Sequence, residues 1–207
     1  MNNIFVWVPK TAGTSIHSAM ATCGHRMINQ SFQKQVYETP KPVIGFNHWT
    51  PELLVKHRVM TREEWDAAWS FAVVRNPWER TVSLWKNHRK RHRNIGFDDW
   101  VSLLIENPTY AAKCMPGISH AYPQVRWTHW DDGTLAVKCI ARHEDLQTFW
   151  DTVICPRLVI PGKQLPRQNV SATDGKTVED RYRRDETRRM VEDYYREDIE
   201  TFGYTFE

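Results

Sequence analysis

Small and charged side chains gather near the start of the chain, directly after a short apolar run. The run, Ile4–Val8, is rich in β-branched and aromatic residues and ends at Pro9, which favours a buried strand. The segment that follows, Lys10–Ser15, has the sequence K-T-A-G-T-S and leads into apolar residues at helical spacing. A strand, a small-residue loop and a helix N-terminus can together gather main-chain N–H groups around an anion. The pattern predicts a site for a phosphate or a phosphate-like group, to which Lys10 adds positive charge.

A second segment of this kind lies in the middle of the chain, where Phe71–Ser83 has the sequence F-A-V-V-R-N-P-W-E-R-T-V-S. Its apolar residues predict a buried strand that ends at Arg75. Asn76 is a favoured helix N-cap, and Pro77 suits the first turn of a helix. An arginine beside a helix N-terminus predicts a second anion site, to which Ser83, two turns into the helix, could add a hydroxyl group.

Together the two segments, P-K-T-A-G-T-S and V-R-N-P-W-E-R-T-V-S, resemble the paired signature of sulfotransferases that use 3′-phosphoadenosine 5′-phosphosulfate (PAPS). The similarity is to the carbohydrate branch of that family, the heparan-type 2-O-sulfotransferases. The segments L-P-R-Q-N-V-S and Y-Y-R-E-D-I-E-T-F-G-Y near the end of the chain look familial as well. The resemblance implies PAPS as co-substrate, 3′-phosphoadenosine 5′-phosphate (PAP) as product, and a hydroxyl of a sugar or glycan as acceptor.

Roles for individual residues follow from the same resemblance. Arg75 and Ser83 would hold the 3′-phosphate of the cofactor. The first loop would hold its 5′-phosphosulfate, through Lys10, Thr11, Ala12, Gly13, Thr14 and Ser15.

Sulfuryl transfer also needs a group that stabilises the leaving phosphate and a base that takes the acceptor proton. The mobile ammonium of Lys10 suits the first task. His48 suits the second, because histidine titrates near neutral pH and this one lies at the exit of a predicted strand, Val43–Phe46. Its place between the two motifs is similar to that of the catalytic histidine in heparan-type 2-O-sulfotransferases. A purely structural histidine is the competing interpretation, and Glu52 is the alternative base.

No metal site is expected. A sulfuryl group carries less charge than a phosphoryl group, and Arg75 stands where a nucleotide kinase would often place a metal-binding Asp. The first loop also lacks the Walker pattern G-x-x-x-x-G-K-[ST], because no glycine precedes Lys10. Two alternatives remain open: a P-loop nucleotide-dependent kinase, and a nucleotide-binding protein without catalytic activity.

Strands that alternate with helices predict an α/β fold of three layers, P-loop-like, with a central, mainly parallel sheet flanked by helices. The length of 207 residues and the absence of a linker predict one sulfotransferase domain over residues 1–207. Beyond the two motifs the sequence predicts a strand over Leu135–Ile140, an extended segment over Gln124–Trp130, a loop over 107–123, and helices over 77–92, 97–106, 144–154 and 180–201.

Bulk composition excludes some partners. The formal net charge is only +3, so overall charge does not indicate nucleic acid, although Lys86–Arg93 is a dense basic run. That run is interpreted as a solvated helix end, which is compatible with attraction of an acidic substrate. We expect no membrane anchor and a cytoplasmic enzyme, because neither a signal peptide nor an apolar run of membrane-spanning length is present.

Of the ten tryptophans, Trp49, Trp127 and Trp130 flank the predicted cleft and could stack on sugar rings or pack in the core.

Overall fold

The computed structural model describes residues 3–22, 48–89, 95–115, 118–161, 164–166 and 175–206. The chain divides into two compact units, and each is described here by itself. The first unit comprises residues 1–74 and 126–169, and the second comprises residues 75–125 and 170–207. The predicted single domain over residues 1–207 therefore stays a prediction.

The centre of the first unit is a parallel sheet with the strand order β1-β2-β5. Its strands are β1 (Asn3–Val6), β2 (Trp69–Val74) and β5 (Cys139–Arg142). Phe5 pairs with Phe71, and Phe71 pairs with Cys139. Because the strands are parallel, their carboxyl ends lie at the same edge of the sheet. The expected α/β fold with a parallel sheet is thus confirmed.

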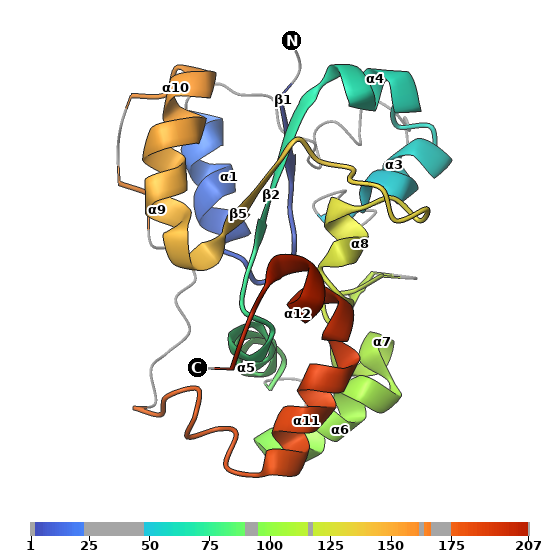
Figure 1. Ribbon diagram of the computed structural model, residues 1–207, viewed down its shortest axis with the longest axis vertical. Coiled ribbons are helices and arrows are strands. Elements are labelled where there is room, and N and C mark those ends of the chain that lie inside the picture. Colours follow the sequence, from blue (N-terminus) through green and yellow to red (C-terminus); the bar gives the residue numbers. More distant parts are fainter. Residues whose placement is uncertain are drawn as a thin grey trace, which may run out of the picture. The chain divides into compact units, whose positions relative to one another are not determined.

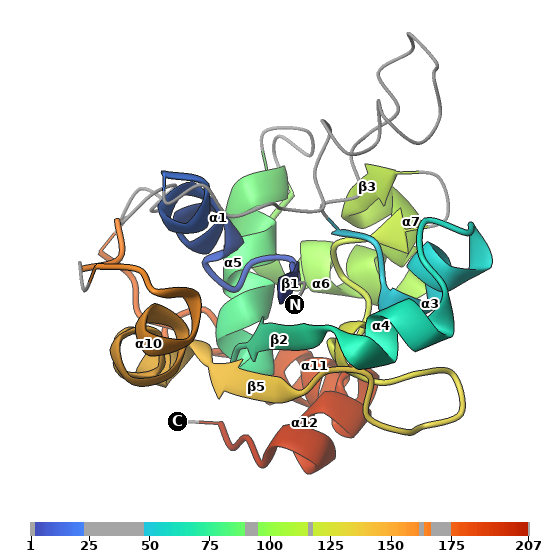
Figure 2. The same ribbon diagram turned by 90° about the horizontal axis from the view of Figure 1, so that it is seen from above.

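Helices flank this sheet. Helix α1 (Gly13–Thr22) and the helical segment from His143 to Leu158 lie on one side, and α3 and α4 lie on the other (Figures 1 and 2). On the α1 side, Phe71 and Ile16 are buried in a common core with Trp150. The remaining bounds are α3 (Pro51–Lys56), α4 (Arg62–Ala67), α8 (Val125–Thr128), the 3₁₀ turn η2 (His143–Asp145), α9 (Leu146–Phe149), the π-helical turn η3 (Trp150–Ile154) and α10 (Cys155–Leu158).

The second unit is mainly helical, and α5, α6 and α11 pack against one another in it (Figure 1). Trp100 on α6 and Val191 on α11 are fully buried. The elements of this unit are α5 (Pro77–His88), α6 (Phe97–Glu106), α7 (Pro108–Ala111), the antiparallel pair β3 (Lys113–Met115) and β4 (Ile118–Ser119), α11 (Asp185–Tyr194) and α12 (Arg196–Phe202).

Helix starts follow the local sequence signals. The hydroxyl of Thr50 accepts a hydrogen bond from the Leu53 N–H at 3.3 Å, with Pro51 in the first turn of α3. Thr61 and Glu64 form a reciprocal capping box at the start of α4. Asn76 accepts from the Trp78 N–H at 3.0 Å and caps α5. The N-cap predicted at Asn76 is therefore confirmed.

Several predicted boundaries are wrong. Strand β1 ends at Val6 rather than Val8, and strand β5 begins at Cys139 rather than Leu135. The predicted loop over 107–123 contains α7, β3 and β4, because Pro108 begins a helix that Asn107 caps by accepting from Tyr110 at 3.0 Å. The predicted extended segment Gln124–Trp130 contains α8 instead.

Two predicted helices also differ from the structure. The segment expected to be one helix over 180–201 begins at Asp185 and breaks at Tyr195 into α11 and α12. The helix expected over 144–154 continues to Leu158, and it passes Pro156 by widening to a π turn in which the Cys155 N–H bonds the Trp150 carbonyl. The predicted strand Val43–Phe46 lies outside the described residues. None of the helices in the described ranges is long and apolar enough to span a membrane.

Candidate active site

The segment Lys10–Ser15, called the donor loop below, turns through an unusual backbone conformation. Lys10 has φ of 70° and Ala12 has φ of 63°, both in the left-handed region, although neither is a glycine. The Ala12 carbonyl then accepts from the Ser15 and Ile16 N–H groups at 2.9 and 3.3 Å, which starts α1. Left-handed residues of this kind cost about 1–3 kcal/mol each and cluster at ligand sites. They are also components of main-chain anion-binding nests.

Packing holds the donor loop in this conformation. Thr11 is fully buried, and its hydroxyl donates to the Val8 carbonyl at 2.9 Å, so its hydroxyl hydrogen is engaged within the loop. Gly13 lies directly against the Trp7 indole: an added Cβ would stand 1.7 Å from the indole nitrogen. Gly13 therefore has a steric role that the sequence pattern alone did not reveal.

His48 lies against the residue that leads into the donor loop. Its Nδ1 is 3.0 Å from the Trp7 carbonyl oxygen, and the two ring centroids are 5.2 Å apart. Because a carbonyl can only accept, Nδ1 carries the hydrogen in this contact, and in the neutral ring the lone pair lies on Nε2. The Trp127 indole donates to the His48 carbonyl at 2.9 Å and fixes its main chain as well.

The structure also places the other candidates in this unit, and Glu52 as the base stays a prediction. Glu52 lies in the first turn of α3, where a carboxylate is stabilised by the helix dipole. Trp127 is fully buried, and Trp130 is buried with its ring under the Arg62 guanidinium at 3.7 Å. For these two tryptophans, core packing is therefore the correct interpretation. Trp49 is half-buried, with its ring 4.9 Å from that of His57.

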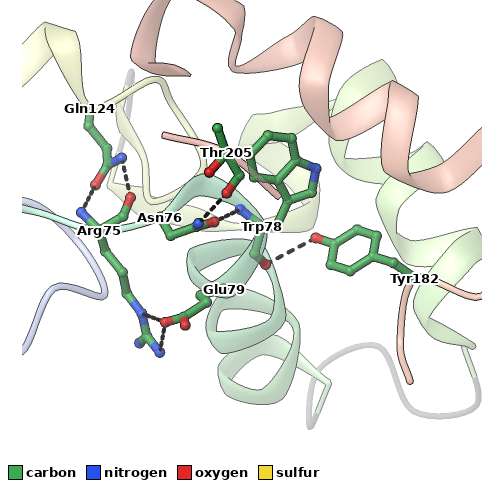
Figure 3. A network of polar contacts seen from close by, with 7 residues as sticks. All are labelled: Arg75, Asn76, Trp78, Glu79, Gln124, Tyr182 and Thr205. Atoms are coloured by element: carbon green, nitrogen blue, oxygen red, sulfur yellow. Dashed lines mark hydrogen bonds and ion pairs between the residues drawn. The ribbon is translucent and has the colours of Figure 1, made fainter. Parts of the chain in front are cut away.

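Arg75, in the second unit, is held by both its side chain and its main chain (Figure 3). Its Nε and Nη2 atoms both donate to Glu79 Oε2 at 3.0 Å. Its main-chain N–H donates to Gln124 Oε1 at 2.9 Å, and its carbonyl accepts from Gln124 Nε2 at 2.8 Å. A guanidinium has five N–H donors and Glu79 engages two, so Arg75 retains the capacity to bind a phosphate. Ser83 is half-buried on the same helix as Glu79.

The sequence model of the sulfotransferase family matches residues 2–205. The chain belongs to the sulfotransferase family. No curated protein and no solved structure gives a match. Family membership confirms the resemblance that was drawn from the two motifs. It identifies the chain as a PAPS-dependent sulfotransferase.

Within this sulfotransferase, the structure places His48 against the residue that leads into the donor loop. His48 contacts Trp7 at the approach to the donor loop, although 41 positions separate them. Strands β1 and β2 pair in parallel and end at the same sheet edge, and the donor loop follows β1. That both motifs hold one nucleotide stays a prediction. A depression of about 340 Å³ along β5 and α9 is lined by none of the predicted site residues.

The sequence did not single out Glu79 or Gln124, the two residues that hold Arg75. Glu79 follows Arg75 at a spacing of four, which is an ion-pair spacing on a helix and could have been noticed. Gln124 carries no such signal, because it lies 49 positions away in a segment that was predicted to be extended.

Proposed function

We propose that this sulfotransferase transfers the sulfuryl group of PAPS to a hydroxyl of a sugar or glycan, with His48 as the base. The observation that supports the proposal is the contact of His48 Nδ1 with the Trp7 carbonyl at 3.0 Å, which in a neutral ring puts the hydrogen on Nδ1 and the lone pair on Nε2. The carbohydrate acceptor is supported by the resemblance of both motifs to the carbohydrate branch.

The proposed reaction is an in-line displacement at sulfur. The acceptor oxygen forms a bond to sulfur as the bond between sulfur and the bridging oxygen of the phosphate breaks. His48 Nε2 takes the acceptor proton. The electron pair of the broken bond stays on the leaving phosphate, where Lys10 and the N–H groups of the donor loop stabilise the developing charge. PAP and the sulfated acceptor are the products.

The cofactor is held at both of its anionic ends. The donor loop binds the 5′-phosphosulfate through Lys10, Thr11, Ala12, Gly13, Thr14 and Ser15. Arg75 and Ser83 bind the 3′-phosphate, for which a guanidinium is suited by its paired donors. The proposed chemistry needs no metal ion, and the proposed compartment is the cytoplasm.

The test is transfer of labelled sulfate from PAPS to a panel of sugar, glycan and phenolic acceptors. His48→Ala should lower kcat by about 10²–10⁴-fold, the usual contribution of a general base, while PAP affinity changes little. His57→Ala is the matched control, because His57 is an exposed histidine at the end of α3, and it should turn over normally.

Three further arms separate the alternatives. A kinase would accept ATP in place of PAPS and would lose activity with a chelator, whereas the proposed enzyme keeps its rate in EDTA. A non-catalytic binding protein would bind PAP without any turnover. Normal turnover by His48→Ala would exclude His48 as the base, and Glu52→Gln would then test the carboxylate.

A further inference from the structure

Gln124 makes an unusual contact with Arg75. Both polar atoms of its side-chain amide bond the main chain of that one residue, with Oε1 accepting from N–H at 2.9 Å and Nε2 donating to the carbonyl at 2.8 Å (Figure 3). The assignment of oxygen and nitrogen is unambiguous, since a main-chain N–H only donates and a carbonyl only accepts. Gln124 is fully buried. Its side-chain amide pairs with the main chain of Arg75, the residue that follows β2, as a neighbouring strand would.

A buried carboxylate in turn holds Gln124. Asp198 on α12 accepts from the Gln124 N–H at 2.8 Å through Oδ2 and from the Val125 N–H at 2.9 Å through Oδ1. Asp198 is fully buried, and burial raises the pKa of its carboxyl, while Arg80 and the two N–H donors oppose that shift. Burying a carboxylate is costly unless it is hydrogen-bonded. Here the bonds that satisfy it fix the main chain at Gln124.

The residues just before Gln124 are fixed in the same way. The buried guanidinium of Arg80 donates through Nη2 to the carbonyls of His120 and Tyr122 at 2.7 and 3.0 Å. The buried hydroxyl of Tyr195 donates to the Ala121 carbonyl at 2.7 Å. Three buried polar side chains therefore hold segment 120–125 at successive points. A network of this kind makes the segment rigid.

We infer that Gln124 is a positioning residue for the 3′-phosphate site, because it holds the Arg75 main chain and so sets where the guanidinium lies. In this role Gln124 does not contact the substrate, and its effect passes entirely through Arg75. The inference rests on the proposed function, in which Arg75 binds the 3′-phosphate. It is distinct from that function, since Arg75 could bind the phosphate without help from Gln124.

The experiment compares two nucleotides that differ only in the 3′-phosphate, PAP and adenosine 5′-phosphate (AMP). Gln124→Met keeps the length of the side chain and removes both amide contacts. It should weaken PAP binding by about tenfold, roughly the worth of one or two hydrogen bonds, and leave AMP binding within about twofold. Gln147→Met is the matched control, because the half-buried Gln147 amide also bonds a main-chain N–H, that of Leu165 at 3.1 Å. The control should preserve the ratio of PAP to AMP affinity.

Arg75→Ala separates the two possible failures. If it leaves the PAP to AMP ratio unchanged, the proposed 3′-phosphate site is wrong. If it collapses the ratio while Gln124→Met does not, only the role of Gln124 is overturned. In an Arg75→Ala background Gln124→Met should have no further effect on the ratio, and an additive effect would show that Gln124 does not act through Arg75.

A second variant covers the case in which Gln124→Met does not fold. Gln124→Glu keeps the acceptor for the Arg75 N–H and replaces the donor to its carbonyl with a second acceptor. It should also lower PAP affinity selectively, with AMP affinity reporting that the protein is folded. Equal losses for both nucleotides would show a merely structural role and would overturn the inference.

Discussion

Trp7 is the residue on which the donor loop and the proposed base both depend. Its indole covers Gly13, and its carbonyl bonds His48 Nδ1 at 3.0 Å. Its ring also stacks on His17, with centroids 5.4 Å apart and planes inclined by 27°. One half-buried tryptophan thus links the strand end, the loop and the first helix, so changes that displace it should affect stability and catalysis together.

Gly13→Ala tests this link. The added Cβ would stand 1.7 Å from the Trp7 indole nitrogen, so the indole must move. Overpacking of this kind costs about 1–3 kcal/mol, which equilibrium unfolding in urea would measure. The same variant should lower kcat, because His48 bonds the Trp7 carbonyl. The cost should fall sharply in a Trp7→Ala background, where the clash is gone, and an undiminished cost there would point to a different cause.

His17 predicts a pH dependence of stability. Burial lowers the pKa of His17 below the usual value of about 6.5, so the unfolded chain binds the proton more readily than the folded one. The free energy of unfolding should therefore fall as pH drops from the unfolded pKa toward the folded pKa. Urea unfolding at about pH 7.5 and about pH 5.5 should show a larger loss for the native protein than for His17→Gln, which does not titrate. Parallel losses would contradict the prediction.

At the scale of elements, the start of α5 joins two distant parts of the second unit. Asn76 Oδ1 caps the helix by accepting from Trp78 N–H at 3.0 Å, and its Nδ2 donates to the Thr205 carbonyl at 2.9 Å (Figure 3). The Tyr182 hydroxyl donates to the Trp78 carbonyl in the same turn, at 3.0 Å. Arg75, the residue proposed to bind the 3′-phosphate, immediately precedes this cap. The contacts that order its main chain are therefore adjacent to those that order the first turn of α5.

Substitutions at Asn76 separate the two contacts. Asn76→Ala removes both and should lower the free energy of unfolding by about 1 kcal/mol or more, the typical value of an N-cap. Asn76→Asp keeps the acceptor, so it should restore the cap while losing the donor to Thr205. Amide exchange near Thr205 should accelerate in both variants, whereas exchange at Trp78 should accelerate only in Asn76→Ala. Equal behaviour of the two variants would show that the cap contributes little.

At the scale of the whole molecule, the features that the sequence predicted correctly are those specified by neighbouring residues. Helix α6 was predicted over 97–106 and spans Phe97–Glu106, because its apolar spacing is complete within ten residues. The N-cap of α5 at Asn76 was likewise predicted from a short motif. The donor loop and Arg75 were found because strand, loop and helix are consecutive there, although their shared role in binding one nucleotide is still a prediction.

The features that could not be predicted depend on partners far along the chain. Tyr195 breaks the last helix while its hydroxyl bonds the Ala121 carbonyl, 74 positions earlier. Asp198 bonds the Gln124 N–H across another 74 positions. Pro108 lies in the segment predicted to be a loop, yet a proline in the first turn is equally compatible with a helix start, and Ala111 and Ala112 beside it are buried. No periodicity within one segment contains this information.

The proposal that both motifs hold one nucleotide predicts a pattern of amide exchange over the whole chain. Bound PAP should slow exchange in the donor loop and also at the start of α5, because ligand binding suppresses local opening at the groups it contacts. AMP lacks the 3′-phosphate and should slow exchange in the donor loop alone. Helix α6 serves as the internal control, since no site residue lies on it. Protection of only one of the two segments by PAP would mean that the motifs do not share a ligand. In Arg75→Ala, loss of protection at the start of α5 with the donor loop still protected would confirm Arg75 as the contact to the 3′-phosphate.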